Sequence, residues 1–208
     1  MSYPWEVVWM TTQASGTPHA AALQEANPGV VTHVCHSPQG VGDGRQYLWR
    51  NCDRHIRRWW AANRESVLTD QVLFLEYDVY CNADLRDHLP VLGGDYGLAG
   101  PRIVSGLMDI RSYWPFEDIP RMPREMQALA CAVAPLALVL LTRAALDAVC
   151  ERRYDPIFAE DIFCETRLPT VIRHAGFRVV AINLPDVHVT PHVPCGRGIF
   201  HPVKQPVL

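Results

Sequence analysis

Short apolar runs alternate along this chain with stretches of helical spacing, which predicts a fold built from both strands and helices. The clearest buried-strand pattern is Gln71-Val72-Leu73-Phe74-Leu75. Other short apolar or β-branched runs mark further strands at residues 5–10, 30–33, 96–99, 137–141 and 177–182. Repeated strand-helix-strand order favours an α/β fold with a mainly parallel central sheet and helices on both of its faces.

Capping residues and the spacing of apolar positions predict helices between these runs. One helix is expected to place Trp59 and Trp60 in the core or in a lid. A second begins after Thr142 as its cap, and a third is kinked at Pro169 and ended by Gly176. The expected helices span residues 18–27, 54–63, 143–152 and 159–175. Residues 103–124 are rich in aromatic residues and prolines without clear periodicity, which is typical of a binding loop or lid.

Composition narrows the class of protein. With 208 residues, 49% of them hydrophobic, the chain is expected to fold as one globular domain with a substantial core. The net charge of −3 and the absence of a dense Lys/Arg run argue against a nucleic-acid surface. The longest apolar run, residues 128–141, contains Pro135 and is shorter than the roughly 20 residues of a membrane helix. The N-terminus lacks the pattern of a signal peptide, so we expect a cytoplasmic location.

The cysteines indicate a reduced protein. They are scattered, odd in number and never spaced as C-x-x-C, which favours buried thiols over disulfides or a zinc site: Cys35, Cys52, Cys81, Cys131, Cys150, Cys164 and Cys195. Cys35 lies between His33 and His36, but no second cluster has the spacing of zinc ligands.

An acidic motif, Glu76-Tyr77-Asp78, follows the strand pattern at 71–75 directly. Side chains alternate along a strand, so Glu76 and Asp78 are expected to point to the same side. Ligand crevices of open α/β sheets lie beyond the carboxyl ends of strands, where two carboxylates can hold a divalent cation against a phosphorylated ligand. The alternative is that the pair simply ends a strand in solvent.

A second acidic pair, Glu160-Asp161, opens the helix expected at 159–175, and His188 and His192 follow it along the chain. Acidic residues favour helix N-termini through the macrodipole, so the pair alone also fits a structural role. The histidines alone equally fit packing or surface roles.

Taken in order, the motifs resemble a GT-A-fold glycosyltransferase. They are Glu76-Tyr77-Asp78, similar to that family's D-x-D, then Leu140-Leu-Thr-Arg-Ala-Ala-Leu146, Ala159-Glu-Asp-Ile-Phe-Cys-Glu-Thr-Arg-Leu168, Gly176-Phe-Arg-Val179 and a closing histidine. The resemblance implies a single Rossmann-type domain with a nucleotide-binding half (1–82) and an acceptor and catalytic half (83–208). The sequence departs from the family in two places. Its acidic motif is E-x-D, and the glycine that the family usually has shortly before the Glu-Asp motif is absent, because that region reads Ala130-Cys-Ala-Val133.

The resemblance also implies a metal site. Asp78 would be the primary ligand of Mn²⁺ or Mg²⁺, with Glu76 a water-mediated or ribose partner and His188 or His192 a further ligand. Such an ion stabilises charge on a departing diphosphate by several kcal/mol. A metal-free alternative uses Lys204 as a point charge on the diphosphate.

Roles in catalysis and donor binding follow from the same resemblance. Asp161 would be the base that takes the acceptor proton, with Glu160 beside it. The nucleotide, favoured to be of the UDP type, would contact Thr11, Thr12, Asp53 and Arg57, although Asp53 equally fits a helix cap. Residues 103–124 would then form a wall on the acceptor side.

Three functions stay open at this point. The first is an inverting glycosyltransferase that joins a sugar from a nucleotide donor to a glycan or other hydroxyl acceptor. The second is a retaining enzyme or glycoside hydrolase that uses carboxylates from the two acidic pairs. The distance between the two catalytic carboxylates would show whether this function applies. The third is an inactive, transferase-like binding protein, which the missing glycine favours slightly.

Overall fold

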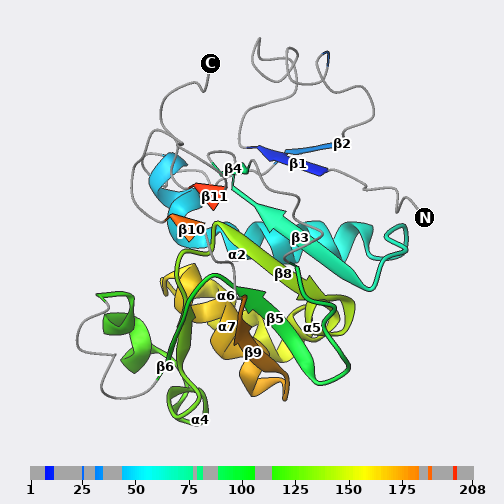
Figure 1. Ribbon diagram of the computed structural model, residues 1–208. Coiled ribbons are helices and arrows are strands. Elements are labelled where there is room, and N and C mark those ends of the chain that lie inside the picture. Colours follow the sequence, from blue (N-terminus) through cyan, green and yellow to red (C-terminus); the bar gives the residue numbers. More distant parts are fainter. Residues whose placement is uncertain are drawn as a thin grey trace. The chain divides into compact units, whose positions relative to one another are not determined.

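The computed structural model describes residues 8–11, 25, 31–34, 44–76, 79–81, 89–105, 114–182, 187–188 and 199–200 (Figure 1). Contacts group the chain into two compact units, residues 1–55 and 56–208. The expected division into functional halves at residue 82 stays a prediction.

The first unit contains a small parallel sheet and the beginning of a long helix. Strand β1 (Val8–Thr11) pairs in parallel with β2 (Val31–Val34), close to two of the strands expected from the sequence. Helix α2 (Gly44–Asn63) continues into the second unit and is interrupted at Asn51, whose φ of −136° and ψ of 23° are not helical. The helix expected at 54–63 is therefore confirmed, although helical structure starts earlier.

The second unit is built on a four-stranded sheet in the order β3-β8-β5-β9. Its strands are β3 (Gln71–Leu75), β8 (Leu138–Thr142), β5 (Tyr96–Gly100) and β9 (Arg178–Ala181). Leu140 of β8 lies opposite Leu73 on one side and Ala99 on the other, and both pairings are antiparallel, whereas β5 and β9 are parallel.

The mixed α/β class is confirmed, but the expectation of a mainly parallel sheet is wrong. One of the three pairings in the described central sheet is parallel. The reason is that β8 is buried along its whole length. A short strand buried on both faces gives a continuous apolar run whichever way it runs, so its direction cannot be inferred from the pattern.

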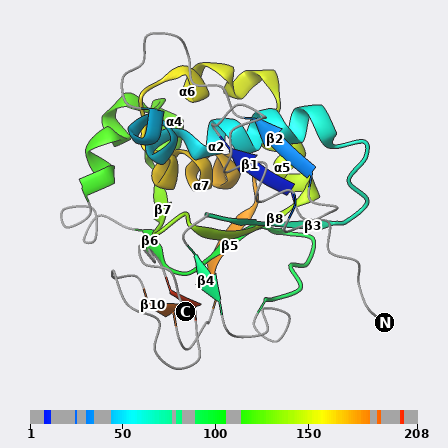
Figure 2. The same ribbon diagram turned by 90° about the horizontal axis from the view of Figure 1, so that it is seen from above.

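Helices α2, α5 (Arg143–Val149) and α7 (Cys164–His174) pack on one face of this sheet (Figure 2). Trp59 of α2 meets Phe74 of β3 edge to face, with ring centroids 5.7 Å apart. Gly97 lies at a β-bulge in β5, where an added Cβ would come within 2.7 Å of Ile172 and 3.0 Å of Ala145. Close approach of α5 and α7 to the sheet thus requires glycine at this position.

The other face of the sheet is apolar but is covered by irregular chain. Ala99, Leu138, Leu140 and Ile182 form a buried cluster there, packed against Leu73, Val79, Leu89, Leu92 and Val180. Among the described residues, helices therefore cover one face, and helices on the second face stay a prediction. The apolar side chains of Val79, Leu89 and Leu92 pack on this face, where helices were expected.

Helices α2 and α5 are joined through side chains that bond backbone carbonyls and each other. Arg143, the first residue of α5, donates hydrogen bonds to the carbonyls of Arg64 and Val67, just beyond the end of α2. The indole nitrogen of Trp60 donates to Asp147 at 2.8 Å. Thr142 caps α5 by accepting from the amide of Ala145, as the sequence predicts.

Smaller elements complete the described chain. They are β4 (Tyr80–Cys81), β6 (Ile103–Ser105), η2 (Trp114–Arg121), α4 (Arg124–Gln127), β7 (Cys131–Val133), η3 (Arg152–Tyr154), α6 (Asp155–Ala159), β10 (Val187–His188) and β11 (Ile199–Phe200). The last two strands form a three-stranded sheet with β4, and β6 pairs with β7. None of the helices within the described ranges combines the length and apolarity needed to cross a bilayer.

The prediction of reduced, buried cysteines holds in part. Cys52, Cys131, Cys150 and Cys164 form no disulfide; Cys131 and Cys164 are buried, whereas Cys52 and Cys150 are half-buried. Burial raises the pKa of Cys131, against the opposing influence of Arg173, and burial likewise raises the pKa of Cys150. Both thiols are therefore protonated and weakly nucleophilic at neutral pH.

Candidate functional site

Strands β3, β5 and β9 end at one edge of the central sheet. This follows from their pairing, because β3 and β5 both run opposite to β8 and β9 runs with β5. Leu75 therefore lies opposite Leu138, and Gly100 lies opposite Ala181. Carboxyl ends of parallel strands are where open α/β sheets bind ligands, so this edge is the candidate site.

Glu76 stands at this edge, directly after β3, as the sequence predicts. Its backbone amide donates to the carbonyl of Ala137 at 2.8 Å, and its carbonyl accepts from the amide of Val79 at 3.2 Å. These bonds hold the backbone of Glu76, which is half-buried, at the end of the strand. Asp78, its expected partner, lies outside the described residues.

Helix α7 brings a further carboxylate to the same edge. In its first turn, Glu165 accepts a hydrogen bond from the amide of Leu136 at 3.1 Å. Leu136 precedes Ala137, the residue bonded to the backbone of Glu76. The sequence interpretation gave Glu165 no role of its own, although its place in the first turn of a helix within the 159–168 motif was a usable signal.

Glu160 and Asp161 lead into α7 but do not belong to it. The expectation that this pair opens a helix over 159–175 is wrong, because α6 ends at Ala159 and α7 begins at Cys164. Glu160 is extended, with φ of −70° and ψ of 146°. Both acidic residues are exposed to solvent, so their carboxylates are accessible to a ligand at this edge.

Side chains from two helices hold this extended segment. The buried Arg167 of α7 donates to the carbonyl of Glu160 at 2.8 Å, and Arg121 of η2 donates to the carbonyl of Asp161 at 2.7 Å. Asp118 of η2 accepts from the amide of Phe163 at 2.9 Å. These bonds to the backbone replace the helical ones that the sequence pattern suggested.

Asp118 and Arg121 were missed as site residues because they lie in the aperiodic stretch 103–124. That stretch was nevertheless expected to form a wall on the acceptor side. Its described part, η2, does contact the acidic segment through these two side chains. An Asp-x-x-Arg spacing within a turn of helix was the one signal available, since it allows an ion pair between the two.

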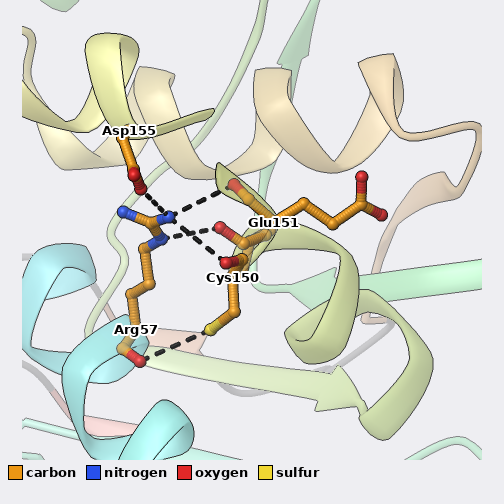
Figure 3. Close-up of polar contacts among 5 residues, drawn as sticks. Arg57, Cys150, Glu151 and Asp155 are labelled. Carbon is orange, nitrogen blue, oxygen red and sulfur yellow. Dashed lines mark hydrogen bonds and ion pairs between the residues drawn. The ribbon is translucent and has the colours of Figure 1, made fainter. Parts of the chain in front are cut away.

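Arg57, expected to contact the nucleotide, has its guanidinium at the end of α5 (Figure 3). Its Nε donates to the carbonyl of Val149 at 2.7 Å, and one terminal nitrogen lies 3.4 Å from the carbonyl of Cys150, 3.3 Å from that of Glu151 and 2.5 Å from Asp155 Oδ1. The Cys150 thiol in turn donates to the carbonyl of Arg57 at 3.5 Å. These contacts are those of a helix C-cap, and the nucleotide contact stays a prediction.

Of the other residues expected to bind the nucleotide, the structure describes the side chain of Asp53 alone. Asp53 is fully buried within α2, and its Oδ1 accepts from the amide of Arg54 at 2.9 Å. Thr11 ends β1, and its side chain lies outside the described residues, as do Thr12 and Lys204. Their assignments stay predictions.

The expected histidine ligands can be placed in part. His188 belongs to β10 and pairs with Phe200 of β11, but its side chain, like all of His192, lies outside the described residues. Within the part of the chain that the structure describes, no three His, Cys, Asp or Glu side chains are grouped closely enough to hold a metal ion. The ligand set of Glu76, Asp78 and a histidine stays a prediction.

Comparisons with protein-family models, with curated proteins and with solved structures found no match to this chain. The fold and the site together define a mixed α/β domain that gathers acidic residues at the carboxyl edge of its central sheet.

Proposed function

We propose that this protein is a glycosyltransferase of the GT-A type, which transfers a sugar from a nucleoside-diphosphate donor to a hydroxyl acceptor. One observation carries the proposal. The amide of Glu76 donates to the carbonyl of Ala137, just before β8, and the amide of the preceding Leu136 donates to Glu165, four residues after Asp161. The order of the motifs leads one to expect acidic residues of both segments at this edge.

The chemistry requires a base and a means of neutralising the leaving group. Asp161 would accept the acceptor's hydroxyl proton as that oxygen forms a bond to the anomeric carbon, while the bond from this carbon to the diphosphate oxygen breaks. Its carboxylate is 68% exposed, which leaves it accessible to an acceptor. A positioned base typically contributes about 10²–10⁴-fold to the rate.

Carboxylates at the end of β3 suit a hard divalent cation. Oxygen ligands are those that Mg²⁺ and Mn²⁺ prefer, so Asp78 and Glu76 would hold such an ion, with His188 or His192 acceptable to Mn²⁺. When bound, it would stabilise negative charge on the diphosphate. Lys204 is the alternative source of positive charge.

Calorimetric titration with UDP, GDP and CDP, with and without Mn²⁺, tests the proposed donor site. We expect one nucleoside diphosphate to bind more tightly with Mn²⁺, and Asp78→Ala to abolish that increase. Glu125→Ala, which removes an exposed carboxylate from α4, is the matched control and is expected to bind like the native protein. Equal metal dependence in Asp78→Ala and the native protein would refute the metal site.

Release of nucleoside diphosphate from a panel of nucleotide sugars tests the chemistry, with water as the acceptor if no other is known. We expect Asp161→Asn to lower this rate about 10²–10⁴-fold. Glu125→Gln is the control for removal of a surface charge. A native rate in Asp161→Asn would exclude this residue as the base, and tight binding without turnover would instead favour the inactive binding protein.

A further inference from the structure

The segment 160–163 separates α6 from α7 and leads into α7 with an extended backbone. Its residues are extended at both ends, with ψ of 146° at Glu160 and 133° at Phe163. Phe163 is the N-cap residue of α7, but its side chain has no oxygen that could satisfy the amides of the first turn. Within the segment, the amide of Ile162 donates to the carbonyl of Glu160 at 2.9 Å, and further hydrogen bonds come from α7 and η2.

Helix η2 supplies the fixing contacts on both sides of Ile162. The amide of Phe163 donates to Oδ2 of Asp118 in a buried hydrogen bond of 2.9 Å, and the carbonyl of Asp161 accepts from Arg121 at 2.7 Å. Ile162 itself has no exposed surface. The buried Ile162 side chain and these two hydrogen bonds restrain the backbone of Asp161, while its side chain stays exposed.

Arg121 also lies beside both carboxylates. The nitrogen that bonds the carbonyl of Asp161 is 3.8 Å from Oδ2 of the same residue and 3.6 Å from Oδ1 of Asp118. These two distances are those of ion pairs, so one hydrogen-bonded nitrogen also places a positive charge next to both carboxylates. Asp118 in turn orients Arg121 from three residues earlier on η2.

We infer that Asp118 and Arg121 are positioning residues that hold the carboxylate of Asp161 in place for proton transfer. The inference rests on the proposed function, in which Asp161 is the base. Arg121 acts through Asp161 and does not itself contact the reacting atoms. Its loss is expected to affect the rate of the chemical step, because misplacing a reacting group by about 1 Å can cost about 10²-fold.

The test measures kcat and KM for donor turnover in Arg121→Ala and Arg121→Lys, with Arg124→Ala as control. Arg124 is an exposed arginine three residues further along the chain, at the start of α4. We expect Arg121→Ala to lower kcat about 10–100-fold with little change in KM, and Arg121→Lys to recover part of the loss. Arg124→Ala is expected to match the native protein.

A double mutant separates positioning from general destabilisation. If Arg121 acts through Asp161, then adding Arg121→Ala to Asp161→Asn costs no further activity beyond Asp161→Asn alone. If Arg121 merely supports the fold, the two losses multiply. Multiplied losses, or a native kcat in Arg121→Ala, would overturn the inference while the proposed function stands.

Hydrogen exchange provides a readout that does not depend on turnover. Asp118→Ala removes the acceptor of the Phe163 amide, and we expect that amide to exchange faster while amides of β8 keep their protection. Asp118→Asn retains an acceptor oxygen and is the control, in which the Phe163 amide is expected to keep its protection. Unchanged exchange at Phe163 in folded Asp118→Ala would contradict the positioning role. A native protein that neither binds nucleoside diphosphates nor releases them from donors would instead refute the proposed function, and with it this inference.

Discussion

Replacement of Arg57 by alanine distinguishes a structural role from a ligand-binding one. The guanidinium donates to the carbonyl of Val149 and reaches the carbonyls of Cys150 and Glu151 at the C-terminus of α5, where a cation interacts favourably with the helix dipole. It also pairs with Asp155 and lies 4.8 Å from the centroid of the Phe158 ring. The Arg57 side chain is only 17% exposed. Alanine would therefore remove the donor of these carbonyls from a largely buried place.

The decrease in the free energy of unfolding that we expect for Arg57→Ala can be estimated from these contacts. A hydrogen bond involving a charged donor contributes about 1.5–3 kcal/mol, and the short bond to Val149 is the main term of this kind. The ion pair adds at most about 0.5 kcal/mol because Asp155 is 59% exposed and its charge is screened. With a cation-π contact of about 0.5 kcal/mol, the total is about 3 kcal/mol. For a chain of this size, that corresponds to a decrease in Tm of roughly 6–12 °C.

Thermal unfolding followed by circular dichroism measures this loss, and nucleotide titration of the same variant below its Tm measures binding. We expect Arg57→Ala to melt early and to bind nucleoside diphosphate as the native protein does. Arg152→Ala, an exposed arginine of η3, is the control and is expected to leave Tm within about 1–2 °C. A native Tm together with lost nucleotide binding would refute the capping argument and support the predicted nucleotide contact.

Three further predictions follow from packing and burial. Gly97→Ala places a Cβ within 2.7 Å of Ile172, so we expect overpacking to cost about 1–3 kcal/mol in urea unfolding, whereas Gly93→Ala, with nothing within 4 Å, has little effect. Burial raises the pKa of Tyr154, so its stabilisation is complete below about pH 10 and is lost as pH rises further; unfolding measured from pH 8 to 11 should show a shallower decline in Tyr154→Phe. The Cys131 thiol has no exposed surface, so it should react with a thiol reagent in urea but not in buffer, and rapid reaction of the native protein would contradict its burial.

Local patterns predicted most of the elements around the sheet. Sequence patterns a few residues long predicted the strand at 71–75, the buried Trp59 and Trp60 and the Thr142 cap, and all three are confirmed. The direction of β8 does not follow from such local patterns. It depends on pairing with β3 and β5, neither of which is its neighbour in sequence.

In the candidate site, too, local sequence patterns predicted some features and missed others. Glu76 was predicted at the end of a strand because the strand itself was evident, and its place at the sheet edge agrees. The break between α6 and α7 was missed because no glycine or proline marks residues 160–163. The extended backbone there donates a hydrogen bond to Asp118 and accepts one from Arg121, about forty residues earlier in the chain, and no local pattern predicts these bonds.

Strand β8 is the partner of both β3 and β5, which do not pair with each other. During synthesis, residues 71–75 and 96–100 leave the ribosome well before residues 138–142. A nascent chain that stops short of residue 138 therefore displays two strands with unsatisfied backbone edges, which are templates for pairing with other chains. Assembly of the sheet must then wait for late translation, and premature termination before this point is expected to yield aggregates in place of a smaller folded domain.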